Sequence, residues 1–155
     1  MITPEIVERY FPKAVQWVTE TEKAILECGQ ALLPQNRKDA EAIGIRRIDD
    51  VRIAVFNAMP LPYDPGLRQL AQQTGLISDS TGGMTFGHGI ALKNRAYDRR
   101  IIAHELAHVM QYERFGDIEA FLKGYVKEIA FPPGYPNGPL EREAELIAHS
   151  VLQNP

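Results

Sequence analysis

The segment that most constrains this chain is His104-Glu105-Leu106-Ala107-His108, which lies inside a continuous helical pattern from Tyr97 to Phe115. At 3.6 residues per turn, one side of this helix is apolar and predicts packing on a core. That side consists of Ile102, Leu106, Val109 and Met110. His104 and His108 lie one turn apart on a shared face, nearly opposite the apolar side. The histidine face is therefore free for a role other than packing.

Two neutral imidazoles at positions i and i+4 can bind one zinc ion, with metal–nitrogen distances near ~2.0–2.1 Å. Glu105 lies about 100° round the helix from His104, beside such an ion rather than on it. We interpret His104 and His108 as ligands of Zn²⁺ and Glu105 as a general base, which is the H-E-x-x-H pattern of zinc metallopeptidases. A solvated histidine pair without a metal is the other interpretation.

A third ligand is expected, because catalytic zinc sites commonly have three protein ligands and one open position. The predicted last helix, Leu140 to Leu152, offers three glutamates. Glu141 and Glu145 share a face that borders its apolar side, whereas Glu143 lies about 200° from Glu141 and is expected to point to solvent. We favour Glu141 as the ligand. Glu145 is then a carboxylate that orients a histidine, or the alternative ligand. A solvated acidic face remains the third interpretation.

The N-terminal part, residues 1–34, predicts packing helices without catalytic residues. Pro12 is expected to interrupt them, and a longer helix is predicted from Lys13 to Leu33. Cys28 falls on the apolar side of that helix and is expected to be a buried, inert thiol. The polar segment from Pro34 to Ala42 predicts a surface connection, with or without one helical turn.

The remaining residues, 51–155, are expected to hold the strands, the metal helix and the ligand helix. Alternating and β-branched residues predict two strands, Val51–Asn57 and Met84–Leu92. The second strand directly precedes the metal helix, so either a substrate pairs with it at a sheet edge or its glycines only mark a bulge. The other expected elements are a short helix over Gly66–Thr74, a helix after Gly116 and a stiff loop over Phe131–Pro139.

Amide hydrolysis also requires a hydrogen-bond donor for the developing oxyanion. Tyr112 lies on the side of the metal helix that carries the histidines. The candidates are Tyr112, Tyr125, Tyr135 and His88. Each tyrosine is equally compatible with a structural role. A lone histidine between glycines, as His88 is, is more often exposed or hydrogen-bonded than a ligand.

Composition excludes several classes of function. The 155 residues carry a net charge of −3, which gives no electrostatic footprint for nucleic acid. No run approaches the ~18 apolar residues of a membrane span, and the first residues lack the basic and apolar regions of a signal peptide. We therefore expect a cytoplasmic location, or a domain of a larger or exported protein, with the oligomeric state open. The single cysteine excludes an internal disulfide.

The sequence H-E-L-A-H-V-M-Q-Y at 104–112, followed by P-L-E-R-E-A-E at 139–145, resembles the gluzincins, in particular small bacterial H-E-x-x-H proteins. These are zinc peptidases whose third ligand is a glutamate on a later helix. The resemblance covers residues 84–150. It implies zinc bound by His104, His108 and Glu141, with Glu105 as the general base. Many gluzincins carry aspartate where Glu145 stands here.

The resemblance also implies an α+β, zincin-like, helix-rich fold with a small mixed or antiparallel sheet packed on the metal helix. Together with the motif, it makes a single zincin-like domain over residues 1–155 the expected organisation. The leading functional hypothesis is a zinc-dependent peptidase or related amide hydrolase acting on a peptide or protein. The alternative is a non-catalytic zinc-binding structural or interaction module with the same site.

Overall fold

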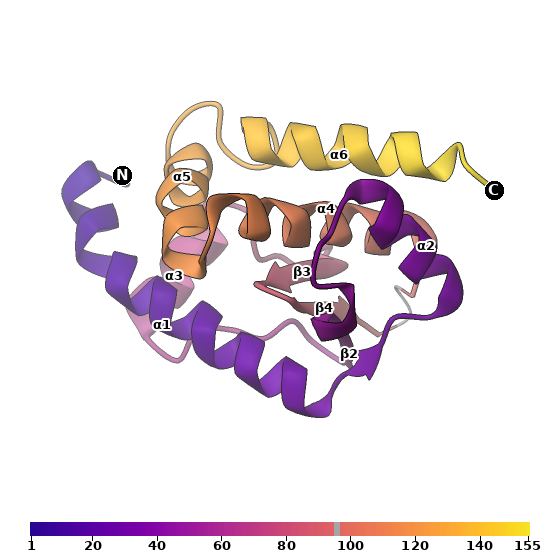
Figure 1. The fold of residues 1–155 in the computed structure, drawn as a ribbon. Helices are drawn as coiled ribbons and strands as arrows, with labels where there is room; N and C mark the ends of the chain where they lie inside the picture. The colour runs from indigo at the N-terminus through magenta and orange to yellow at the C-terminus, as the bar shows by residue number, and fades with distance from the viewer. Residues whose placement is uncertain (95–96) are drawn as a thin grey trace.

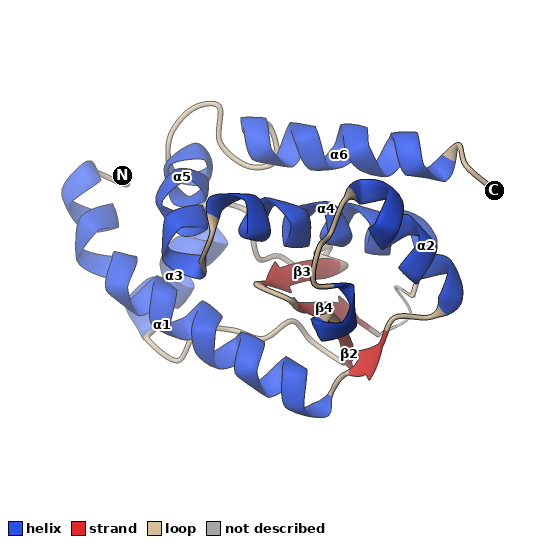
Figure 2. Cartoon of the chain, in the orientation of Figure 1, coloured by secondary structure: helices blue, strands red, loops and turns tan. Residues whose placement is uncertain are grey.

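The computed structural model describes residues 1–94 and 97–155. Within these ranges the chain forms six α-helices, a short 3-10 helix and a four-stranded sheet, which confirms the predicted α+β class (Figures 1 and 2). None of the described helices combines the length and the hydrophobicity that a membrane-spanning helix needs. The elements are α1 (Pro4–Cys28), β1 (Gln30–Ala31), α2 (Pro34–Ile43), η1 (Ile48–Asp50), β2 (Arg52–Phe56), α3 (Pro65–Gln73), β3 (Gly83–Phe86), β4 (Gly89–Lys93), α4 (Arg99–Phe115), α5 (Ile118–Ala130) and α6 (Pro139–Leu152).

The sheet is mixed, with the strand order β1-β2-β4-β3. The two central strands, β2 and β4, are parallel, with Ile53 opposite Ile90, and both outer pairs are antiparallel. The sheet lies between α1 and α4, and α6 lies along the far side of α4 (Figure 1). Strand β3 is therefore an edge strand of the sheet, and it lies next to α4.

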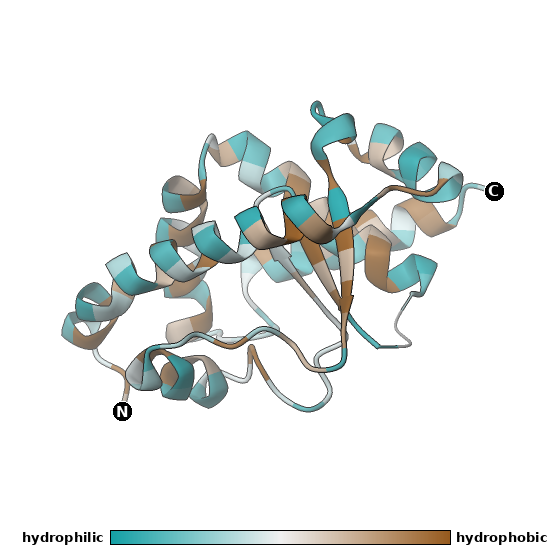
Figure 3. Ribbon diagram, turned by 90° about the horizontal axis from the view of Figure 1, so that it is seen from below, coloured by the Kyte–Doolittle hydropathy of each residue, from teal (hydrophilic) through white to brown (hydrophobic). Residues whose placement is uncertain are grey.

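Helix α4 is the centre of the molecule. The predicted apolar side is confirmed, because Ile102, Leu106 and Val109 are at most 1% exposed and pack with the central strands. The strands in the middle of Figure 3 are largely apolar, whereas α1 in front of them alternates polar and apolar residues. A second cluster joins α1, α5 and the sheet through residues such as Ile25, Phe86 and Phe121. Helix α4 is thus covered by the sheet on one side and by α6 on another.

The N-terminal predictions were partly wrong. Helix α1 continues through Pro12, although an interior proline costs about 3 kcal/mol. Apolar side chains on both sides of the proline, Phe11 before it and Val15 and Val18 after it, pack on the core, and their burial offsets this cost. Cys28 is exposed rather than buried, because α1 ends at this residue and the chain turns into β1, a strand that was not predicted.

The segment predicted as a polar surface connection is the helix α2. Its polar composition concealed a buried side, because Asn36 and Asp39 are only 5% and 3% exposed. The Asp39 carboxylate accepts two hydrogen bonds of 2.9 Å from the Arg99 guanidinium. The ion pair with Arg99 allows the charged Asp39 side chain to be buried. The same pair holds α2 against α4.

The predicted strand Met84–Leu92 is a hairpin of two strands. Gly87 has a φ of +62° and, with His88, forms the turn between β3 and β4. A left-handed φ is readily adopted by glycine, which explains why the chain reverses there. Helix α4 begins at Arg99 rather than at the predicted Tyr97, since the Asp98 side chain caps it by accepting from the Arg100 N–H.

Candidate metal centre

The candidate ligands come from α4 and from the first turn of α6, which packs antiparallel on it. Pro139 opens α6 at a position where its missing N–H costs nothing. The Leu140 N–H donates to Glu128 of α5 at 2.8 Å, and the Gln111 amide of α4 donates to the Leu140 carbonyl oxygen at 2.9 Å. These bonds fix the first turn of α6, and with it Glu141, against the histidine face.

His104, His108 and Glu141 converge at one point. The Nε2 atoms of the two histidines are 3.2 Å apart, and the Glu141 carboxylate lies 3.1 Å from His104 Nε2 and 2.7 Å from His108 Nε2. Three donors about 2.0–2.1 Å from a common ion at tetrahedral angles would be about 3.3 Å apart. The two nitrogens meet this spacing, and the two Glu141 distances, which involve Oε1 for His104 and Oε2 for His108, are somewhat shorter. The three residues therefore fit a metal ion, and nitrogen and oxygen donors of this kind suit zinc.

The second nitrogen of each imidazole also has a partner. His104 Nδ1 lies 3.0 Å from the Glu145 carboxylate, which also accepts a 2.9 Å bond from Arg100. His108 Nδ1 lies 2.8 Å from the side-chain oxygen of Gln111. With Nδ1 donating its proton in each case, both Nε2 lone pairs point at the shared centre. Glu145 therefore lies where an orienting carboxylate was expected.

The carboxylates around His104 make the centre suited to positive charge. Burial by itself lowers the pKa of this imidazole, but the hydrogen bond to Glu141 and the nearby carboxylate charges outweigh it and raise the pKa of His104 to about 9. The two imidazoles have the opposite effect on the carboxylate. Their hydrogen bonds and charges overcome burial and lower the pKa of Glu141. A divalent cation can take the place of the protons that this arrangement holds.

Glu105 lies beside the cluster rather than in it. Its side chain is buried, and the Thr85 hydroxyl of β3 donates to its carboxylate at 2.8 Å. Gly83 of the same strand leaves room for this carboxylate, because a Cβ there would lie 3.1 Å from Glu105 Cγ. The edge strand thus holds the candidate base in place, a role for Thr85 that the sequence did not reveal.

The four candidate oxyanion donors are placed differently. The Tyr125 hydroxyl donates to Glu141 at 2.9 Å, and the Tyr112 hydroxyl reaches the Thr85 carbonyl oxygen at 3.4 Å. His88 is 2.8 Å from the Glu113 carboxylate and does not line the cavity at the cluster. Tyr135 lines that cavity, and its hydroxyl has no hydrogen-bond partner among the described residues. Burial and the charges of Glu141 and Glu105 raise the pKa of Tyr135 to about 12, which keeps it a donor at neutral pH.

Glu143 does not simply point to solvent, as its helix position predicted. Its carboxylate accepts bonds of 2.7 Å from Gln111 and 3.0 and 2.8 Å from Arg114, and its side chain is 38% exposed. Gln111 thus connects His108 to two sites on α6. The sequence did contain one signal for this role of Gln111. Gln111 follows His108 by three residues, so the two side chains lie on the same face of the helix.

Changing Gln111 to leucine is expected to weaken zinc binding by about 10–100-fold, because His108 loses the acceptor that orients it. The matched control is Gln72→Leu, at an exposed position on α3. Gln111→Glu keeps an acceptor for His108 Nδ1 and should recover part of the loss. Competition with a chelator measures the three affinities. Equal affinities for Gln111→Leu and Gln72→Leu would show that His108 needs no such partner.

The fold and the cluster together define an α+β protein with a candidate metal centre of the H-E-x-x-H type. Residues 71–116 match the family described as the eCIS core domain. The matched segment runs from the end of α3 through α4, so it includes His104, Glu105 and His108 but stops before Glu141. It spans less than half of the 155 residues, and the similarity is confined to that segment. No curated protein and no solved structure matches the chain.

Proposed function

We propose that this protein is a zinc-dependent peptidase or related amide hydrolase of the gluzincin type. The observation that carries the proposal is the placement of Glu105. A purely structural metal site needs only its ligands, whereas here a buried carboxylate outside the cluster is held by Thr85 at the wall of a cavity that the cluster also lines. The match over residues 71–116 supports this reading, because it contains the whole H-E-x-x-H segment.

His104, His108 and Glu141 would hold the zinc ion, with Glu145 and Gln111 orienting the imidazoles. Zinc, when bound, lowers the pKa of water towards ~7 and polarises a carbonyl oxygen. Glu105 accepts the proton of the attacking water and transfers it to the leaving amine. The Thr85 hydroxyl keeps the Glu105 carboxylate pointing towards the cavity during both transfers.

Strand β3 is the proposed docking edge for the substrate backbone. Among the described residues its only partner strand is β4, and all four residues of β3, Gly83–Phe86, line the cavity with Glu105. An extended peptide can add to such an edge through main-chain hydrogen bonds. That placement would bring an amide bond of the peptide beside Glu105.

Tyr135 is the proposed donor to the oxyanion, because the hydroxyls of Tyr112 and Tyr125 already have acceptors. Tyr135→Phe is expected to lower kcat by about 10–1000-fold with little change in KM, as loss of a transition-state hydrogen bond does. Tyr63→Phe, at a residue that is 90% exposed, is the control. Steady-state kinetics of both variants test the assignment, and an unchanged kcat for Tyr135→Phe would reject it.

The function itself is tested with the wild-type protein reconstituted with a zinc salt. We expect about one zinc per chain by elemental analysis. We also expect cleavage of a mixed-sequence peptide library, detected by mass spectrometry, that is lost with a chelator and restored by zinc. Failure to take up zinc would reject the site. Zinc uptake without any cleavage would instead favour a non-catalytic zinc-binding structural or interaction module.

A further inference from the structure

We propose that the cavity beside the metal cluster accepts one large apolar side chain of the substrate, aromatic or leucine-sized, and that helix α1 determines this preference. The inference rests on the proposed hydrolase site and names the class of substrate that it selects. Its basis is the composition, the size and the location of the cavity walls. Most of these walls are formed by residues other than the candidate metal ligands.

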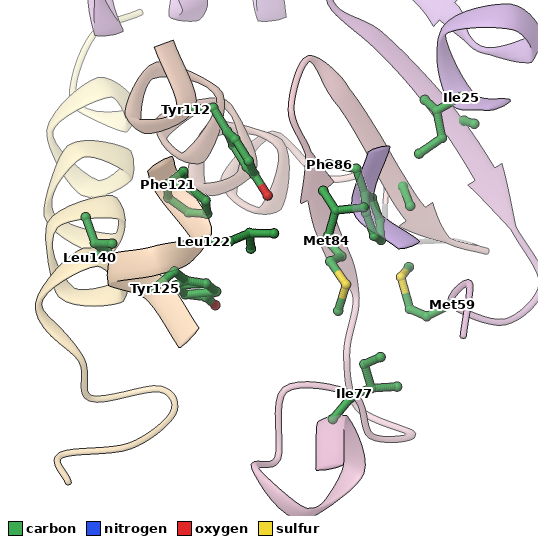
Figure 4. Close-up of a cluster of buried hydrophobic side chains, with 14 residues drawn as sticks. Ile25, Met59, Ile77, Met84, Phe86, Tyr112, Phe121, Leu122, Tyr125 and Leu140 are labelled. Carbon is green, nitrogen blue, oxygen red and sulfur yellow. The ribbon is translucent and has the colours of Figure 1, made fainter. Parts of the chain in front are cut away.

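The cavity is lined almost entirely by apolar side chains from α1, α3, β3 and α5. Among its described lining residues, charged groups occur only at the metal end, where His104, Glu105, His108 and Glu141 meet it. Figure 4 shows Tyr112 and Leu122 pointing towards Met84 and Phe86 across this region. Pockets with apolar walls and a few convergent polar groups are typical ligand sites. Burying an unpaired charge against such walls would be costly, so acidic and basic side chains are disfavoured.

The volume of the cavity, about 140 Å³, indicates what it can hold. An apolar cavity of about 150 Å³ in another protein stays dry and binds benzene. The space here therefore suits one aromatic ring or one branched aliphatic side chain. Alanine or glycine would leave it unfilled and would forgo the apolar contact.

Helix α1 forms the wall opposite the ligand helix and lies outside the segment that matches the eCIS core domain. Phe11, Ala14, Trp17 and Val18 are its central lining residues. None of them is bonded to a metal ligand or to Glu105. Substitutions on α1 can therefore alter the pocket and leave the cluster intact.

Trp17 provides a direct measure of whether the pocket is occupied. It is the single tryptophan of the chain, and its ring packs edge-on against Phe86 with centroids 5.2 Å apart. Its indole nitrogen is buried without a hydrogen-bond partner among the described residues. A ligand that enters the pocket changes the surroundings of this indole, and so its fluorescence.

The test uses the zinc-loaded protein and four small hydroxamates that differ only in one side chain: alanine, leucine, phenylalanine or lysine. The hydroxamate group chelates zinc in all four compounds. Differences in their affinities therefore arise from the side chain alone. Titration followed by Trp17 fluorescence and calorimetry should give leucine and phenylalanine Kd values about 10–100-fold below that of alanine. The lysine compound should be the weakest.

Ala14→Phe, which fills the cavity from α1, is expected to bring the four affinities within a few-fold of one another. Ala24→Phe, at an exposed position of the same helix, should preserve the preference. Ala14→Leu is a smaller change for the case that the phenylalanine variant does not fold, as judged by circular dichroism and zinc content.

Equal affinities of the four compounds for the wild type would overturn the pocket assignment and leave the metal centre standing. A preference that survives both Ala14 variants would overturn the role of α1. Absence of binding by all four compounds at full zinc content would overturn the pocket as well. A side-chain preference in a protein that cleaves no peptide would instead keep the pocket and reject the hydrolase proposal.

Discussion

Replacing Glu105 by glutamine is expected to lower peptide hydrolysis by about 100- to 10,000-fold and to leave zinc content and folding unchanged. The amide is nearly the same size as the carboxylate, and its oxygen can still accept the 2.8 Å bond from the Thr85 hydroxyl. It cannot accept the proton of the attacking water. The loss therefore falls on kcat, which is measured with any peptide that the wild type cleaves.

The matched control for this variant is Glu119→Gln, an exposed glutamate in the first turn of α5. Elemental analysis and thermal unfolding show whether Glu105→Gln keeps its metal and its fold. Undiminished hydrolysis by a zinc-loaded Glu105→Gln protein would assign the base to another residue. Loss of zinc in this variant would mean that Glu105 supports the ligands rather than the reaction.

The candidate metal-binding face of α4 could be predicted because it depends only on residues that are close together in the sequence. The positions of His104, Glu105 and His108 follow from helical periodicity alone, and the confirmed apolar side of α4 placed that face away from the sheet. The same reasoning on α6 separated Glu141 from Glu143, since residues four apart share a face. The structure brings Glu141 within 3.1 Å of His104 Nε2, as a ligand requires.

The errors arose where burial depends on partners far away in the sequence. Helix α2 looked like a surface loop because its buried side includes Asp39, and its partner Arg99 is sixty residues away. Gln111 looked like an ordinary helix residue because its acceptors, the Leu140 carbonyl and Glu143, belong to another helix. Helical periodicity predicts which side of a helix is apolar. It does not predict which polar side chains will form hydrogen bonds or ion pairs inside the folded protein.

Replacing Glu141 by alanine is expected to weaken zinc binding by more than the ~10–100-fold that loss of an orienting partner costs, and to remove activity. This carboxylate lies against both Nε2 atoms, at 3.1 and 2.7 Å, so its loss leaves two ligands. Glu145→Ala should cost about 10–100-fold, because His104 is the one candidate ligand that this carboxylate contacts, through the outer nitrogen Nδ1. Competition with a chelator ranks the affinities.

The Glu143 variant tests whether a residue without contact to the candidate ligands affects zinc affinity through an intermediate residue. It contacts no histidine, but it holds Gln111, which in turn orients His108. Glu143→Ala should therefore cost less than Glu145→Ala, and more than the exposed control Glu119→Ala, whose effect on zinc affinity should be negligible. If Glu145→Ala were the one variant that abolished zinc binding, Glu145 would be the ligand and Glu141 the orienting carboxylate, since both lie near His104. If all three variants bound zinc as the control does, the cluster of His104, His108 and Glu141 would not be the metal site, because a carboxylate ligand cannot be removed without cost.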